Sequence, residues 1–152
     1  MRKLKYALTL LLSVGILLAA SPDTGKWKMN QEKSKFTRGE APKNEEMAIS
    51  SQGDQLQVTI VGTDADGTPI AISYIVPVSG GAGQMQQGGS YDGVSTKRVN
   101  DKTRDTTFTK DGNQLVAQHM VVSSDGKTMT VTVKGVGPVG KPVEGVLVFD
   151  KE

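Results

Sequence analysis

Hydrophobic and polar residues alternate along most of the chain, and this pattern predicts β-strands. Leu56, Val58 and Ile60 share one face of residues 55–61, and methionine and valine alternate with threonine in the same way in residues 127–133. A period of two is typical of a strand with one buried face. Further strands are predicted around Trp27 and at residues 46–51, 69–76, 94–99, 104–110, 114–123 and 143–149.

Short turns join these segments, so strands that follow one another in the sequence are predicted to pair antiparallel. Asp111-Gly112 and Asp125-Gly126 supply the positive-φ residue that tight hairpins need. No window after residue 20 has the pattern of a good amphipathic helix. A long meander without covering helices must pair its outer edges or expose them, and closure removes the edges. We therefore predict an all-β, up-and-down antiparallel β-barrel of about eight to ten strands, with a sandwich as the alternative.

An internal repeat supports this architecture and orients the side chains. An offset of 73 residues places residues 50–78 on residues 123–151, and the identical pairs fall on hairpin glycines and on strand positions. A barrel of this size is filled by side chains or holds one small ligand. The predicted interior consists of Met47, Ile49, Leu56, Val58, Ile60, Ile70, Ile72, Tyr74, Val76, Met120, Val122, Met129, Val131, Val133, Val143, Leu147 and Phe149.

The first twenty residues have the order of a secretory signal. Arg2, Lys3 and Lys5 precede an apolar stretch, residues 7–18, and small residues follow at the junction with Ser21. We predict a signal peptide at residues 1–20 and one domain at residues 21–152, secreted to the periplasm or the medium. An uncleaved anchor is the alternative. The mature chain keeps 15 of the 18 basic residues against 16 acidic ones, so no electrostatic motive remains for nucleic-acid binding, and no membrane span is predicted in it.

Composition excludes several kinds of site. The chain has no cysteine and one histidine, so disulfides and the usual zinc or thiol sites cannot form. His119 falls in the repeat frame of Glu46, which places it on the outer surface. The Asp64-Ala65-Asp66-Gly67 segment predicts a turn rather than a calcium loop. Carboxylates are absent from the predicted interior, so an acid–base pair could form only at the rim. We therefore predict no catalytic residue, no metal and no cofactor.

Two further features lie near the predicted rim. Residues 79–89 are rich in glycine but lack the ending of a phosphate-binding loop, so we predict a flexible rim loop that gates the barrel together with Tyr91. Arg98 either points inward, where it could meet an anionic head group, or points outward and pairs with a neighbouring aspartate. The outward pairing is favoured, and both orientations remain open at this point.

The first predicted strand carries a resemblance. Gly25-Lys26-Trp27-Lys28-Met29, followed by Ser34 and Phe36, is similar to the Gly-x-Trp opening of lipocalins and intracellular fatty-acid-binding proteins. From Gly25 onward the chain resembles an uncharacterised family of secreted, lipocalin-like proteins of soil bacteria such as acidobacteria. The segments that carry this resemblance include Lys33-Ser34-Lys35-Phe36, Ala41-Pro42-Lys43, Tyr91-Asp92-Gly93 and Phe149-Asp150-Lys151.

The resemblance implies a structural role for Gly25 and Trp27, with the tryptophan packed across a closed end of the barrel beneath a basic residue from elsewhere in the sheet. The chain differs from the pattern of fatty-acid-binding proteins in two respects. Residues 31–44 offer no counterpart of the helical lid of fatty-acid-binding proteins, because Gly39 and Pro42 interrupt them. No motif places the arginine and tyrosine that hold a fatty-acid carboxylate in that family.

These observations favour a secreted, non-enzymatic protein that holds a small hydrophobic or amphipathic ligand in its barrel. The alternative is a structural or interaction protein of the cell envelope whose barrel is filled by side chains. Cavity volume separates the two hypotheses. Ligand identity and oligomeric state stay open. The predicted ligand-binding residues of the interior and rim are Leu56, Val58, Ile60, Ile72, Tyr74, Tyr91, Arg98, Met129, Val131, Val133 and Leu147.

Overall fold

The computed structural model describes residues 20–152, and every regular element within them is a β-strand. The predicted signal peptide lies outside the described residues except for Ala20. No helix in this part of the chain is long and apolar enough to cross a membrane. The strands are β1 (Gly25–Met29), β2 (Lys35–Arg38), β3 (Asn44–Gln52), β4 (Gln55–Thr63), β5 (Pro69–Pro77), β6 (Gly80–Ala82), β7 (Gln84–Gln87), β8 (Gly93–Asn100), β9 (Thr103–Lys110), β10 (Asn113–Val122), β11 (Thr128–Val136) and β12 (Pro142–Lys151).

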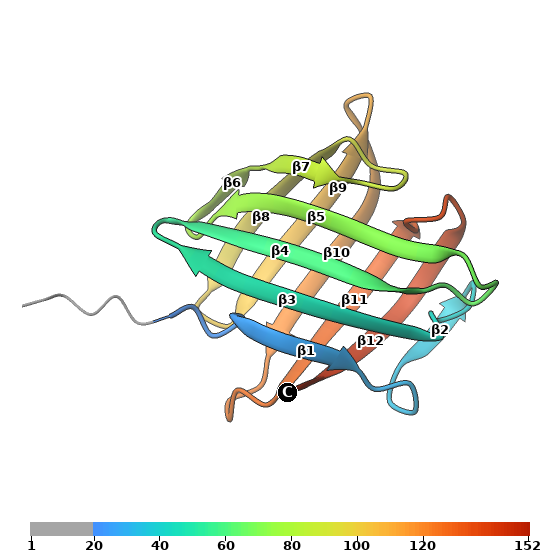
Figure 1. The fold of residues 1–152 in the computed structure, drawn as a ribbon, viewed down its shortest axis with the longest axis horizontal. Coiled ribbons are helices and arrows are strands. Elements are labelled where there is room, and N and C mark those ends of the chain that lie inside the picture. Colours follow the sequence, from blue (N-terminus) through green and yellow to red (C-terminus); the bar gives the residue numbers. More distant parts are fainter. Residues whose placement is uncertain (1–19) are drawn as a thin grey trace, which may run out of the picture.

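The strands form one antiparallel, nearly closed barrel (Figure 1). The order is β6-β8-β9-β10-β11-β12-β1-β3-β4-β5-β7, and β2 pairs with β12 beside this path. Nine of the twelve strands correspond to those predicted from alternation. The predicted up-and-down barrel is therefore confirmed, and the sandwich alternative is not adopted.

The glycine-rich segment forms two short strands at the seam of the barrel, so the prediction of a flexible rim loop is wrong for it. β6 pairs with β8, and β7 pairs with β5, so the segment fills the gap between the two outer strands. Gly83, between β6 and β7, donates a backbone hydrogen bond to the carbonyl of Val94 at 2.9 Å. Glycine and glutamine carry no hydrophobic alternation, which is why the sequence pattern does not indicate these two strands.

The internal repeat is visible in the structure. Under the offset of 73 residues the hairpin β4–β5 has the same register as the hairpin β11–β12: Leu56 lies opposite Val76, and Met129 lies opposite Phe149. Their turns are closed alike, because the amide of residue 64 donates to the carbonyl of residue 68 at 2.8 Å and that of residue 137 donates to residue 141 at 2.7 Å.

The inward face is the one that the alternation predicted. All residues of the predicted interior are buried except Val143, which is half-buried and packs against the core. Rings outside the predicted interior also point inward. Phe108 stacks on Tyr91 with ring centres 4.8 Å apart and meets Tyr74 edge to face at 5.3 Å. These rings fill space that the aliphatic residues alone would leave, so the barrel is mostly solid.

The end of the barrel where β1 begins, called the closed end below, is filled around Trp27. The Trp27 side chain is fully buried, and its Nε1 donates to the carbonyl of Asp23 at 2.9 Å. The Lys151 ammonium lies 5.2 Å from the centre of the indole ring, within the range of a cation–π contact. A Cβ at Gly25 would lie 2.8 Å from Cε of Lys151, so glycine makes room for this lysine.

A buried ion pair completes the closed end. Arg104 Nε donates to Asp23 Oδ2 at 3.2 Å, and both side chains are more than nine-tenths buried. A terminal nitrogen of Arg104 also donates to the carbonyl of Val78 at 3.1 Å.

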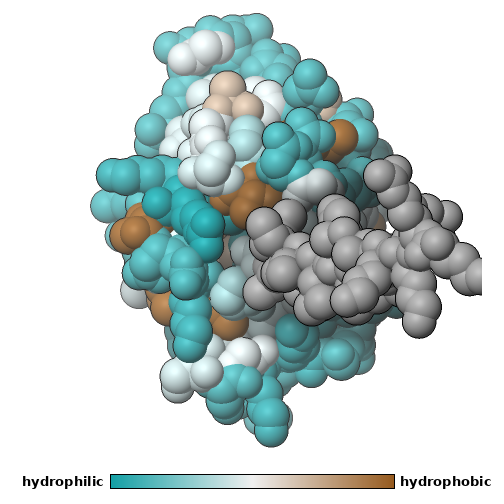
Figure 2. Space-filling model, turned by 90° about the vertical axis from the view of Figure 1, so that its left-hand side faces the viewer, coloured by the Kyte–Doolittle hydropathy of each residue, from teal (hydrophilic) through white to brown (hydrophobic). Residues whose placement is uncertain are grey.

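Figure 2 views the molecule from the side on which the N-terminal end of the described chain lies, where mainly hydrophilic side chains face the viewer.

Candidate functional site: a carboxylate-lined cavity at the barrel mouth

The opposite end of the barrel, called the mouth below, contains an internal cavity of about 50 Å³. The mouth is formed by the start of β3, the turns β4–β5 and β11–β12, and residues 36–42. The floor of this inner cavity is apolar. It is lined by Phe36, Pro42, Ile60, Ile70, Ile72, Tyr91, Val133, Pro138, Val143 and Leu147, together with polar residues described below.

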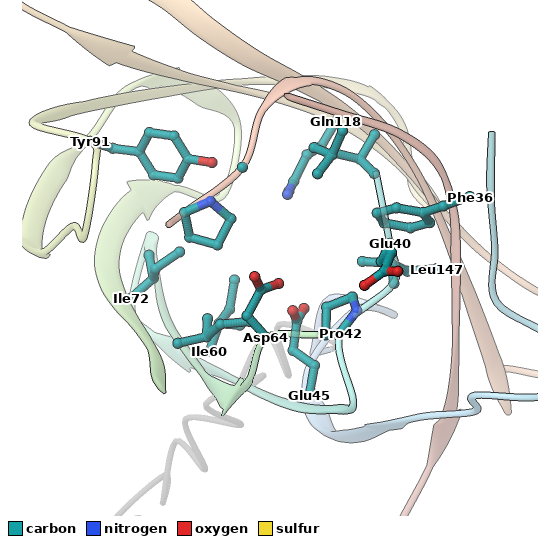
Figure 3. A pocket seen from close by; sticks show the side chains of 15 residues that line it. Phe36, Glu40, Pro42, Glu45, Ile60, Asp64, Ile72, Tyr91, Gln118 and Leu147 are labelled. Carbon is teal, nitrogen blue, oxygen red and sulfur yellow. The ribbon is translucent and has the colours of Figure 1, made fainter. Parts of the chain in front are cut away.

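Three carboxylates and one amide face this apolar floor. Glu40, Glu45 and Asp64 point into the same space, and Gln118 reaches toward it from the opposite wall (Figure 3). Among the described residues that line the cavity, none is basic. The mouth therefore concentrates negative charge in a largely apolar setting.

Glu45 is the most unusual of these groups. Alternation along β3 turns Glu45, Met47 and Ile49 inward, and Glu45 is only 8% exposed. Burial, and secondarily the nearby Asp64 carboxylate, raises the pKa of Glu45 to about 7, because both disfavour the charged form. Glu45 accordingly changes charge near neutral pH.

The turn β4–β5 places Asp64 beside Glu45. Gly67, with φ of +92°, donates to the carbonyl of Asp64 at 2.9 Å and closes the turn. In the adjacent strands, Gly62 lies opposite Glu45, and a Cβ at Gly62 would lie 2.3 Å from the carbonyl oxygen of Asn44. Glycine at this position lets β3 and β4 approach closely at the mouth.

The turn β11–β12 spans the mouth and is held on both sides. The Tyr91 hydroxyl donates to the carbonyl of Val136 at 2.8 Å, and Ser90 Oγ donates to the carbonyl of Pro138 at 2.8 Å. On the other side Lys141 forms an ion pair with Asp66. The hydrogen bond from the Lys141 ammonium, chiefly, holds the pKa of Asp66 below its usual range. The turn thus forms a tethered roof over the inner cavity.

An outer cleft of about 230 Å³ adjoins the inner cavity. The two spaces share Glu40, Asp64, Gly137, Pro138 and Val143 as lining residues. The two spaces are therefore adjacent at the mouth, on either side of these residues. Typical small-molecule sites enclose about 300–1,000 Å³, so the inner cavity alone suits only a small group.

Five of the eleven predicted ligand-binding residues line the inner cavity: Ile60, Ile72, Tyr91, Val133 and Leu147. Five others are buried and fill the barrel without lining it, namely Leu56, Val58, Tyr74, Met129 and Val131. Tyr91 is only 6% exposed, and its hydroxyl is a tether rather than part of a loop gate.

Arg98 does not lie with the other predicted site residues. The prediction that it belongs to the ligand-binding interior or rim is therefore wrong. Arg98 lies near the closed end, where its side chain is 34% exposed and pairs with Asp101 at 2.7 Å. Arg104, its partner across β8 and β9, occupies the interior instead. The pairing with a neighbouring aspartate favoured from the sequence is therefore found, but Arg98 makes it at the end of β8 on the face that it shares with Arg104, not on the outer face. His119 has the exposed position that the repeat predicts and contacts Asp105 at 2.5 Å.

Sequence reasoning missed Glu45 because it began the strand at Glu46, two residues after the observed start at Asn44. The repeat contains the signal, since the offset that places Glu46 on His119 also places Glu45 on Gln118. Both residues face the same cavity. The expectation that carboxylates are absent from the inward-facing positions is wrong at Glu45, where the strand reaches the mouth.

Comparison of the chain with protein-family models, with curated proteins and with solved structures finds no match. The fold and the mouth geometry therefore carry the functional argument, and the resemblance to lipocalin-like proteins of soil bacteria stays a prediction.

Proposed function

We propose that this chain is a secreted, non-enzymatic binding protein that holds a small amphipathic ligand at the barrel mouth. The observation that carries the proposal is the inner cavity, with apolar floor and polar wall, adjoining the outer cleft. The floor would bury an apolar group and the polar side chains would fix its orientation, which is how small-molecule sites are usually built.

The packing of the barrel limits the size of this ligand. Buried side chains fill the barrel from Trp27 at the closed end to Ile60 and Leu147 at the mouth. A share of about 30 Å³ per water molecule in the liquid makes the inner cavity large enough for one or two waters or one small group. A long acyl chain has no place along the axis, so we infer that only one end of the ligand enters.

Two valines of β11 provide a test. Val133 lines the inner cavity, whereas Val131, two residues deeper, is buried without lining it. Val133→Ile adds a methylene to the cavity and is expected to weaken binding at least tenfold with little loss of stability. Val131→Ile, the control, is expected to leave binding unchanged and to cost about 1–3 kcal/mol by overpacking. Native mass spectrometry and thermal shift with a panel of four- to six-carbon amines, alcohols and acids measure both effects.

The competing proposal is a structural or interaction protein with a filled barrel. The fully buried rings and the small volume of the inner cavity favour it. Under this alternative no member of the panel shifts the melting temperature, and Val133→Ile behaves as a simple stabilising or neutral change. That combined result would reject ligand binding at the mouth.

A further inference from the structure

Glu45 is a buried acid that has no hydrogen-bond or ion-pair partner among residues 20–152. It is 8% exposed, and neither a hydrogen bond nor a basic group contributes to its ionisation. The contrast within the same molecule is Asp23, which is equally buried but paired with Arg104 at 3.2 Å. Buried charges in proteins are normally paired, so the mouth has the anionic half of an ion pair and lacks the cationic half.

The ionisable groups that line the inner cavity with Glu45 are acidic or neutral, and the basic group that lines the outer cleft, Lys141, pairs with Asp66 and also attracts Asp64 and Glu40. Asp64 faces Glu45 from the turn β4–β5 and Glu40 from the segment before β3, and both line the same cavity. Tyr91 and Tyr74 lie within electrostatic reach of Glu45, and burial raises the pKa of each, so both stay neutral. Among the described lining residues no lysine, arginine or histidine supplies compensation.

The apolar floor decides which kind of cation fits. Ile60, Ile72 and Leu147 offer no oxygen ligands, and no three histidine, cysteine or acidic side chains of residues 20–152 are grouped to hold a metal ion. A hard metal ion needs several oxygen ligands. An organic cation instead combines a charged end for the carboxylates with a body that the apolar walls bury.

We propose that the mouth binds an alkylammonium ion, whose charged end lies between Glu45 and Asp64 and whose alkyl group contacts the apolar walls. This inference rests on the proposed function and names the ligand class of the same site. A short alkyl chain extends into the outer cleft past Pro138 and Val143, which line both spaces.

Binding of such a cation is linked to the proton on Glu45. The ammonium needs the charged carboxylate, so below the pKa of about 7 each binding event must first release a proton. Affinity is therefore expected to approach a tenfold fall per pH unit below that value, or roughly 50-fold from pH 7 to pH 5. Above pH 7 it is expected to be flat until the amine itself loses its proton near about pH 10.

The test compares three probes of equal size on the full chain: n-butylammonium, 1-butanol and butyrate, titrated by calorimetry and by amide NMR shifts. We expect the ammonium ion to bind at least tenfold more tightly than the alcohol, and butyrate to bind least. Glu45→Gln is expected to weaken ammonium binding at least tenfold and to leave the alcohol unchanged.

Glu46→Gln is the matched control, because Glu46 is the next residue of β3 and its side chain is exposed on the outer face. It is expected to leave all three affinities unchanged. Equal affinities for ammonium and alcohol, or equal effects of the two substitutions, would overturn the ammonium inference while the proposed function stood. Absence of binding by all three probes would overturn both. Calorimetry in buffers of different ionisation heat gives a second measure in the unaltered protein, where release of about one proton at pH 6 is expected.

Discussion

At the scale of single residues, the burial of Glu45 has a stability cost that depends on pH. Burial and the nearby Asp64 carboxylate disfavour the charged form of Glu45 relative to the neutral carboxyl. The folded pKa of about 7 lies above the ordinary value of 4.5. The favourable contribution is therefore complete below about pH 4.5 and is lost as the pH rises through about 7.

Glu45→Gln is expected to stabilise the ligand-free protein in alkaline solution. Glutamine has a similar shape and carries no charge, so the difference in unfolding free energy from the unaltered protein should be near zero at pH 4. It should grow to about 3 kcal/mol in favour of the variant at pH 9. Urea denaturation at several pH values measures it. Glu46→Gln, on the outer face, should show no such trend, and a difference that did not change with pH would contradict the buried state of Glu45.

At the scale of elements, closure of the barrel depends on a crossing at Gly83. The chain leaves β6, which pairs with β8, and enters β7, which pairs with β5, so Gly83 lies between these two partners and contacts both. A Cβ there would lie 2.4 Å from the carbonyl oxygen of Ile75 and 2.5 Å from a methyl group of Val76. No side chain fits without moving a strand.

Gly83→Ala is expected to open this seam and to destabilise the protein by about 2 kcal/mol or more, because backbone atoms of β5 would have to move. Thermal unfolding measures the loss, and faster exchange of the amide of residue 83, which donates to the carbonyl of Val94, locates it. Gly53→Ala is the control. Its Cβ would meet nothing within 4 Å, and only its φ of +64° opposes the change, at about 1 kcal/mol. Equal losses would show that the crossing is not tightly packed.

Alternation predicted most of the barrel because long strands with one buried face have a period that the sequence displays. It could not indicate β6 and β7, whose glycines and glutamines pair only because the barrel must close. At the site, alternation placed Ile72 and Val133 inward but could not reveal how far toward the mouth each strand extends. Arg98 and Arg104 are cross-strand partners on one face. Alternation therefore could not show which of the two arginines would be buried.

At the scale of the whole molecule, the two ends of the barrel handle buried charge differently. The closed end pairs Asp23 with Arg104 and seals the space with Trp27. At the mouth, no basic residue that lines the inner cavity pairs with Glu45, which lies beneath the roof formed by the turn β11–β12. The closed end is therefore built for stability, and the mouth retains an unmet electrostatic interaction of the kind that functional sites often contain.

This division predicts opposite consequences of altering the two ends. Asp23→Ala leaves Arg104 buried without its partner and is expected to cost about 3–5 kcal/mol of stability, which for a chain of this size lowers the melting temperature by roughly 10 °C or more. Asp101→Ala is the matched control. It removes the carboxylate from Arg98, the cross-strand partner of Arg104, but Asp101 is 83% exposed, and such pairs contribute about 0–1 kcal/mol.

Amine binding at the mouth should be the same in both variants at temperatures where they are folded, because the roof contacts of Tyr91 and Ser90 do not involve the closed end. Calorimetric titration with n-butylammonium beside each melting curve measures the two properties together. Loss of binding in Asp23→Ala while the fold persists would mean that the two ends are coupled through the barrel wall. In that case the mouth could not be treated as an independent site.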